Sequence, residues 1–237
     1  MFKSNTARRT GFRITAALFG VFNLVALFLF YYLFDLVDRI EKGDYDAWDT
    51  FSGMEGFLKA WDFIEVGVWI AMLIAMIMYI YRVQKNLVSI EANVKYSPGW
   101  AIGAWFVPFL NLWRPYQIIR DGFHTTCRVV QSLRKGSGQE AAYTRSTRWM
   151  TATCVTLAIT IATARISDRT EFLIFAHSFL SVVAAFCVFQ YLQSFGYWEQ
   201  ELEALKMDGT IDSYLDKRGK DKLPEPEYTG ETPGWYT

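Results

Sequence analysis

Four stretches of the chain are almost entirely apolar, and their lengths predict the fold. They lie at about residues 14–34, 62–81, 149–166 and 172–195. The first contains 21 residues without a charged side chain, and a helix needs about 20 apolar residues to cross roughly 30 Å of hydrocarbon. The pattern therefore predicts an all-α membrane protein, a four-span transmembrane helical bundle.

The charged residues between these spans predict their orientation, although the formal net charge is zero. The N-terminal flank carries four Lys and Arg residues and no acid. Residues 35–60 carry three Lys and Arg against seven Asp and Glu, and residues 82–148 carry ten against three. Because loops rich in Lys and Arg stay cytoplasmic, we expect both termini and residues 82–148 to lie inside.

The last part of the chain has a different composition from the spans. We expect residues 1–198 to form an integral membrane domain and residues 199–237 to form a cytoplasmic tail. From about Lys217 the tail is rich in charge, proline and glycine. Such a composition buries too little apolar surface to offset the entropy of ordering, so the tail is expected to be mostly flexible.

The segment GWAIGAWFVPFLNLWRPYQ, residues 99–117, is hydrophobic but contains residues that a membrane helix avoids. Pro108 and Pro115 would each cost about 3 kcal/mol in a helix interior. Arg114 would add roughly 2.5–3.5 kcal/mol in hydrocarbon. A fifth span would also move the basic residues that follow to the outer side. We predict instead a re-entrant or interfacial segment at 99–114, on the cytoplasmic side, turning at Pro108.

A basic amphipathic helix is predicted at 115–135, because Pro115 suits a first helical turn and glycines follow Lys135. One side of this helix is apolar: Tyr116, Ile119, Phe123, Cys127, Val130 and Leu133. The residues expected to face away are Arg120, Asp121, His124, Arg128 and Lys135. Such helices lie along membrane surfaces, where each basic residue near anionic lipid contributes about 1 kcal/mol. Packing against a cytoplasmic partner is the alternative.

The motif WFVPFLNLWRPYQ, residues 105–117, resembles the signature of a bacterial membrane family, domain of unknown function 4328. The resemblance covers roughly residues 14–195 and implies a multi-span bacterial inner-membrane protein without an assigned activity. On the motif, the candidates for binding lipid or a partner are Trp105, Pro108, Asn111, Trp113, Arg114 and Pro115. The basic helix adds Tyr116, Arg120 and Arg128.

Polar residues inside the predicted spans are candidates for a functional site, because hydrocarbon offers them no partner. Glu65 and His177 are predicted to lie at similar depth in the membrane. They could form a pair that titrates or binds a ligand, and the alternative is an outer-interface pair satisfied by water or packing. Span three carries a hydroxyl stripe that lines a polar path or mediates close helix packing. The candidate intramembrane residues are Asn23, Glu65, His177, Thr156 and Thr160.

No motif for catalysis or for a metal occurs in the sequence, so we expect no cofactor. A haem held by two histidines is disfavoured, because His124 and His177 are the only two and are predicted on opposite sides of the membrane. The three cysteines include no C-x-x-C pair, which favours packed, reduced thiols.

The features together favour a non-enzymatic scaffold or accessory subunit at the cytoplasmic face of the inner membrane. Its expected partners are anionic lipid headgroups and a membrane or cytoplasmic protein, with no nucleic acid. One alternative is a small transporter or channel that uses the threonine stripe of span three. A second is an enzyme that processes lipid headgroups, which would bring Arg114 and His124 together with an acid.

Overall fold

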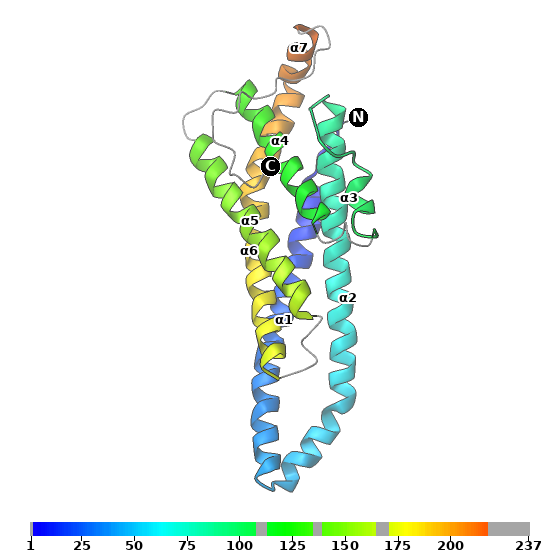
Figure 1. Ribbon diagram of the computed structural model, residues 1–237, viewed down its shortest axis with the longest axis vertical. Helices are drawn as coiled ribbons and strands as arrows, with labels where there is room; N and C mark the ends of the chain where they lie inside the picture. The colour runs from blue at the N-terminus through cyan, green and yellow to red at the C-terminus, as the bar shows by residue number, and fades with distance from the viewer. Residues whose placement is uncertain (1, 108–112, 135–138, 165–170, 218–237) are drawn as a thin grey trace. The chain divides into compact units, whose positions relative to one another are not determined.

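The computed structural model describes residues 2–107, 113–134, 139–164 and 171–217. These residues form helices and connecting segments without a strand, which confirms the all-α prediction. The helices are α1 (Thr6–Glu41), α2 (Tyr45–Ser89), α3 (Trp100–Gly103), α4 (Arg114–Leu133), α5 (Gln139–Ala164), α6 (Glu171–Met207) and α7 (Thr210–Lys217) (Figure 1).

Three of the described helices are long and apolar enough to cross a membrane. They are Thr6–Glu41, Tyr45–Ser89 and Phe175–Met207, and they contain the predicted spans at 14–34 and 62–81 and most of that at 172–195. Helix α5 covers most of the predicted span at 149–166 but is not among these three. Five threonines between Thr151 and Thr163 lower its mean hydropathy.

The chain divides into two compact units. Unit 1 contains the residues up to Ser4, Ile80–Tyr143 and the residues from Gly196 onward. Unit 2 contains Asn5–Tyr79 and Thr144–Phe195. Helices α2, α5 and α6 each contribute residues to both units.

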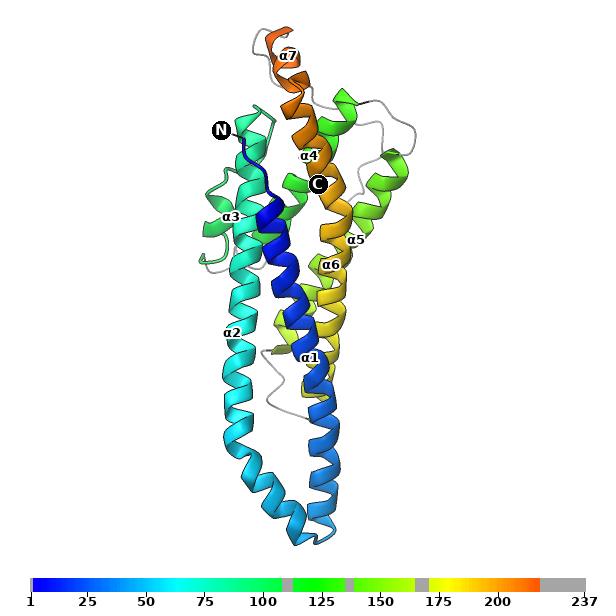
Figure 2. The ribbon, with the colours of Figure 1, turned by 180° about the vertical axis from the view of Figure 1, so that it is seen from behind.

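Unit 2 is an antiparallel arrangement of apolar helices. Helix α1 contacts α2 through Phe22 and Trp61, whose rings stack with centroids 4.0 Å apart. It also approaches α6 closely, since a Cβ atom added at Gly20 would lie 2.8 Å from the Cβ atom of Ala185. Figures 1 and 2 both show α1 beside α6. Small residues at such contacts allow helices in lipid to approach and pack.

The outer faces of α1 and α2 in unit 2 are apolar. Phe28 of α1 is 69% exposed and Phe63 of α2 is 82% exposed. Leu18, Val25 and Ile74 are exposed as well. Large apolar side chains exposed along two helices are typical of a membrane or protein interface.

Unit 1 has its own core, built from segments far apart in sequence. Among its buried side chains are Leu87, Phe123, Val130, Trp198 and Ile211. Gly122 of α4 lies directly against α2, because a Cβ atom there would be 3.1 Å from Nε2 of Gln84 and 3.3 Å from Cγ1 of Val83. The absence of a side chain at Gly122 therefore allows α4 to pack onto the end of α2.

The first part of the predicted tail is structured in unit 1. Helix α6 continues to Met207, and α7 follows after a turn at Gly209, where φ is +76°. Leu202, Leu205 and Ile211 are buried. Residues 218–237, for which flexibility is predicted, lie outside the described residues.

Candidate functional site

The arginine of the sequence motif lies among aromatic rings. The guanidinium carbon of Arg114 is 5.1 Å from the ring centroid of Tyr96 and 5.7 Å from that of Trp100. The Oε1 atom of Gln117 accepts hydrogen bonds from Tyr96 (3.1 Å) and from Arg114 (3.4 Å). Because cation–π contacts favour the planar guanidinium, Arg114 ties the segment before α3 to the start of α4.

Other motif residues are exposed around this cluster. The predicted re-entrant segment begins as the one-turn helix α3, which is followed by turn residues up to Phe106. Phe106 is 76% exposed and Trp113 is also exposed, whereas Trp105 is half-buried. Pro108 and Asn111 lie outside the described residues.

Helix α4 occupies the region for which the sequence predicts a basic amphipathic helix. It begins at Arg114, so Pro115 takes the second helical position, where a missing N–H costs little. Arg120 stacks on Tyr116 at 5.4 Å. Burial extends beyond the predicted apolar side, since Ile118, Thr125, Thr126 and Val129 are buried as well. The helix is therefore packed within unit 1 on more than one side.

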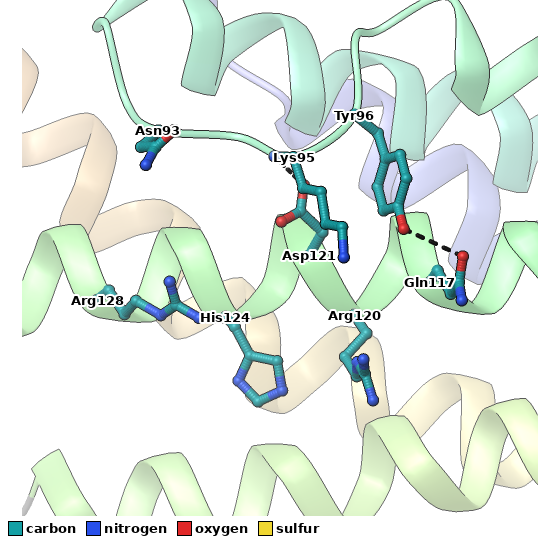
Figure 3. A pocket seen from close by; sticks show the side chains of 8 residues that line it. All are labelled: Asn93, Lys95, Tyr96, Gln117, Arg120, Asp121, His124 and Arg128. Atoms are coloured by element: carbon teal, nitrogen blue, oxygen red, sulfur yellow. Dashed lines mark hydrogen bonds between the residues drawn. The ribbon is translucent and has the colours of Figure 1, made fainter. Parts of the chain in front are cut away.

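The polar face of α4 forms one wall of a pocket of about 370 Å³. The opposite wall is the segment that follows α2. The lining residues are Asn93, Lys95, Tyr96, Gln117, Arg120, Asp121, His124 and Arg128 (Figure 3). We call this cavity the α4 pocket.

Asp121 joins the two walls of the α4 pocket. Its carboxylate accepts a hydrogen bond from the backbone N–H of Lys95 at 3.1 Å and another from the N–H of Tyr96. The side chain of Gln84 also bonds to it. Burial raises the pKa of Asp121, and the hydrogen bonds oppose that rise. The acid therefore holds the segment at 95–96 against α4.

His124 lies between two arginines on the same face of α4. Its Nδ1 atom is 2.8 Å from the hydroxyl oxygen of Tyr143. Burial lowers the pKa of His124 to about 4, with further contributions from the positive charges of Arg128 and Arg120. The imidazole is therefore neutral near pH 7.

The charges of the α4 pocket favour an anion. Lys95, Arg120 and Arg128 carry three positive charges, and Asp121 carries the one negative charge among the lining residues. Within the described residues, no group of three or more His, Cys, Asp and Glu side chains is arranged to hold a metal ion. Chemically, the arrangement offers charge-assisted hydrogen bonds to an anionic group and a neutral imidazole beside it.

The candidate polar residues of the spans bond mostly to their own helices. Asn23 is buried and donates a hydrogen bond to the carbonyl of Phe19 at 2.9 Å. Thr156 donates to the carbonyl of Ala152 at 2.8 Å. Thr160 is also buried, but its hydroxyl has no hydrogen-bond partner among the described residues. Its carbonyl accepts a hydrogen bond from the hydroxyl of Thr163. Such bonding within a helix is typical of packing hydroxyls.

The predicted pair of Glu65 and His177 is not brought together by any contact found in the described residues. The Nδ1 atom of His177 lies 3.1 Å from the hydroxyl oxygen of Thr163 on α5. Glu65 is half-buried on α2, with Asp62 as its charged neighbour.

Sequence reasoning named Arg120 and Arg128 as binding residues but assigned no role to most of the other lining residues of the α4 pocket. Gln117, Asp121, His124 and Arg128 recur at spacings of three or four, which marks one face of a helix. This polar stripe was the available signal. Asn93, Lys95 and Tyr96 had no such signal, because their place opposite α4 depends on the path of the chain after α2.

The described helices define an all-helical protein with three candidate membrane-spanning helices, as expected of a multi-pass membrane protein. A family model described as domain of unknown function (DUF4328) matches residues 41–195, more than half of the chain. The chain belongs to this family, which confirms the resemblance found in the sequence. No curated protein and no solved structure shows significant similarity to the chain.

Proposed function

We propose that this protein is a non-enzymatic scaffold or accessory subunit with four membrane spans and both termini in the cytoplasm of a bacterium. In this proposal unit 2 lies in the inner membrane, and unit 1 engages lipid headgroups or a protein partner at the cytoplasmic face. The exposed apolar side chains of α1 and α2 support the membrane location of unit 2.

The observation that carries the proposal is that the helix ends predicted to be cytoplasmic all belong to one unit. The residues before α1, the end of α2, the start of α5 and the end of α6 all belong to unit 1. A compact unit cannot lie on both sides of a bilayer. If α6 spans the membrane, we therefore expect α5 to span it too. This supports four spans, even though α5 is not among the three helices that are apolar enough to cross a membrane.

The orientation can be tested with single cysteines in a chain whose Cys127, Cys154 and Cys187 are replaced by serine. Lys42→Cys places a thiol in the turn between α1 and α2, and Met207→Cys places one at the exposed end of α6. A membrane-impermeant maleimide should label position 42 in intact cells and position 207 only after permeabilisation. Labelling of both positions in intact cells would refute the proposed topology.

The scaffold role is tested separately, by purifying the full chain from native membranes in a mild detergent. A partner present at a fixed stoichiometry supports an accessory subunit, and it should dissociate when exposed motif residues such as Phe106 and Trp113 are replaced by serine. Purification of the intact chain without any stoichiometric protein or retained lipid would contradict it.

A second candidate, an enzyme acting on lipid headgroups, is favoured by one observation: His124 and Asp121 line the same pocket. Two features favour binding over catalysis. The carboxylate of Asp121 is engaged by backbone N–H groups, and Arg114 is held by Tyr96 and Trp100. Headgroup turnover by the purified chain that disappears in His124→Gln would establish the enzyme instead.

A further inference from the structure

We infer that the α4 pocket binds a phosphate-bearing ligand, a lipid headgroup or a soluble phosphate monoester, through Lys95, Arg120 and Arg128. The inference concerns a small-ligand site in unit 1 and does not rest on the scaffold role or on the orientation of the chain.

The charge of the pocket matches this ligand. Three basic side chains against Asp121 leave a formal excess of two positive charges. A phosphate monoester carries about −1.5 to −2 near pH 7, whereas a single carboxylate carries only one negative charge. Arginine is also suited to phosphate, because its guanidinium fork donates two parallel hydrogen bonds to two oxygens.

The geometry brings cations from two directions. Arg120, His124 and Arg128 follow one another at intervals of four along α4, and Lys95 extends from the opposite wall (Figure 3). Asp121 offsets only one of the three positive charges, and its carboxylate is bonded to backbone N–H groups of the opposite wall. These bonds also fix the distance between the two walls.

The size of the pocket fits a small phosphate compound. Its volume of about 370 Å³ lies at the lower end of the roughly 300–1,000 Å³ found for small-molecule sites. That space accommodates a phosphate group with a short organic part, such as a glycerol unit.

The environment of His124 provides a further sign of positive potential. Arg128 and Arg120 both lower the pKa of the imidazole, in addition to the effect of burial. Two cations that destabilise a third positive charge in their vicinity will stabilise a bound anion in the same place. The neutral imidazole adds a hydrogen-bonding group without adding charge.

The test measures binding to the full chain purified in a nonionic detergent. Glycerol 3-phosphate is titrated by calorimetry, with succinate as a dicarboxylate of equal charge. Binding to a lipid headgroup is measured with nanodiscs that contain phosphatidic acid and is compared with binding to nanodiscs of phosphatidylcholine alone. Binding of the soluble ester or of phosphatidic acid supports the inference and assigns the source. Absence of both, or equal affinity for succinate, overturns it.

Two substitutions locate the site. Arg128→Gln and Lys95→Gln each remove one exposed cation, and each should weaken binding about tenfold or more, as expected for a charge-assisted hydrogen bond. Arg145→Gln removes an exposed arginine of α5 outside the pocket and should leave affinity unchanged. An equal loss in Arg145→Gln, or unchanged affinity in folded Arg128→Gln and Lys95→Gln, overturns the assignment. Elution volume and thermal midpoint confirm folding.

Discussion

Glu91 lies two residues after the end of α2, in a backbone conformation that glycine adopts more readily than any other residue. Its φ is +56°, and the N–H of the next residue, Ala92, returns to the carbonyl of Leu87. A residue with a Cβ atom in this left-handed region costs roughly 1 kcal/mol or more. Glu91→Gly should therefore stabilise unit 1 by about 1 kcal/mol.

A thermal unfolding curve in detergent measures this effect as a higher midpoint for Glu91→Gly. Glu91→Ala is the matched control, because it removes the same charge but keeps the Cβ atom, and its midpoint should stay near that of the wild type. A rise of equal size in both variants would trace the effect to the charge rather than to the backbone.

His124 should make the stability of unit 1 depend on pH. Its pKa is about 4 in the folded protein against 6.5 ordinarily, so the folded state binds fewer protons than the unfolded state between these values. The stabilisation is complete above pH 6.5 and is lost as the pH falls toward 4, at up to about 1.4 kcal/mol per pH unit.

The effect of His124 has to be separated from that of Asp121, whose pKa is raised in the folded protein. This raised pKa increases the stability of the folded state as the pH falls, the opposite of the effect of His124. The comparison is therefore between the wild type and His124→Gln, whose amide cannot take up the proton. The thermal midpoint of the wild type should decline more steeply than that of the variant from pH 6.5 to 5. Parallel declines would show that His124 titrates normally.

Arg114 illustrates what sequence reasoning can and cannot show for a single residue. The motif marked it as important, and its charge suggested headgroup phosphates. The structure places it on the rings of Tyr96 and Trp100. These rings precede it by 18 and 14 positions, and only the fold of the intervening segment decides that they meet. The residue type was informative, but its partners depended on tertiary structure.

At the scale of elements, the contact between α4 and α2 depends on Gly122. In Gly122→Ala the added methyl group would lie 3.1 Å from Nε2 of Gln84 and 3.3 Å from Cγ1 of Val83. Gln84 is fully buried and donates a hydrogen bond to the carbonyl of Ile118, so it has little room to move. Overpacking of this kind costs about 1–3 kcal/mol.

Gly67→Ala provides the control for Gly122→Ala, since Gly67 lies in α2 with nothing within 4 Å of its would-be Cβ atom. It should be neutral or slightly stabilising, as helix-interior Gly to Ala changes generally are. Thermal unfolding of both variants checks this contrast. Equal midpoints would mean that α4 can shift away from α2 without cost.

The boundaries of α4 were predictable because proline, apolar spacing and the following glycines all lie close together in sequence. The covering of its polar face was not, because it comes from residues 93–96 and from Tyr143 of α5. Helices α2 and α6 are also longer than the predicted spans. Their polar ends continue from the apolar stretches into unit 1, where burial of Leu87 and Leu202 stabilises them.

At the scale of the whole molecule, unit 1 is assembled from three separate parts of the chain. The backbone N–H of Lys3 donates to Asn86, whose side-chain amide donates to the carbonyl of Lys3. Arg134 forms an ion pair with Glu201. Hydropathy predicts which stretches are apolar, but such long-range contacts leave no periodic signal. For this reason hydropathy does not indicate a unit that is built from both ends of the chain.

The membrane location of unit 2 yields a prediction for Phe28, which is 69% exposed on α1. If this face contacts lipid, Phe28→Arg places a charge in hydrocarbon at a cost of about 2.5–3.5 kcal/mol on insertion scales. After extraction with alkaline carbonate, the amount of the protein that remains in the membrane fraction should then fall severalfold. A face exposed to water would instead accept arginine without penalty.

Tyr45→Arg is the matched control for Phe28→Arg, because Tyr45 is 86% exposed at the first position of α2, beside the turn after α1. In the proposed topology this turn lies outside the hydrocarbon, so arginine there should leave recovery unchanged. The two sites have similar exposure and differ mainly in predicted depth. A loss confined to Phe28→Arg therefore reports the bilayer, whereas equal recovery of both variants would mean that α1 does not face lipid at Phe28.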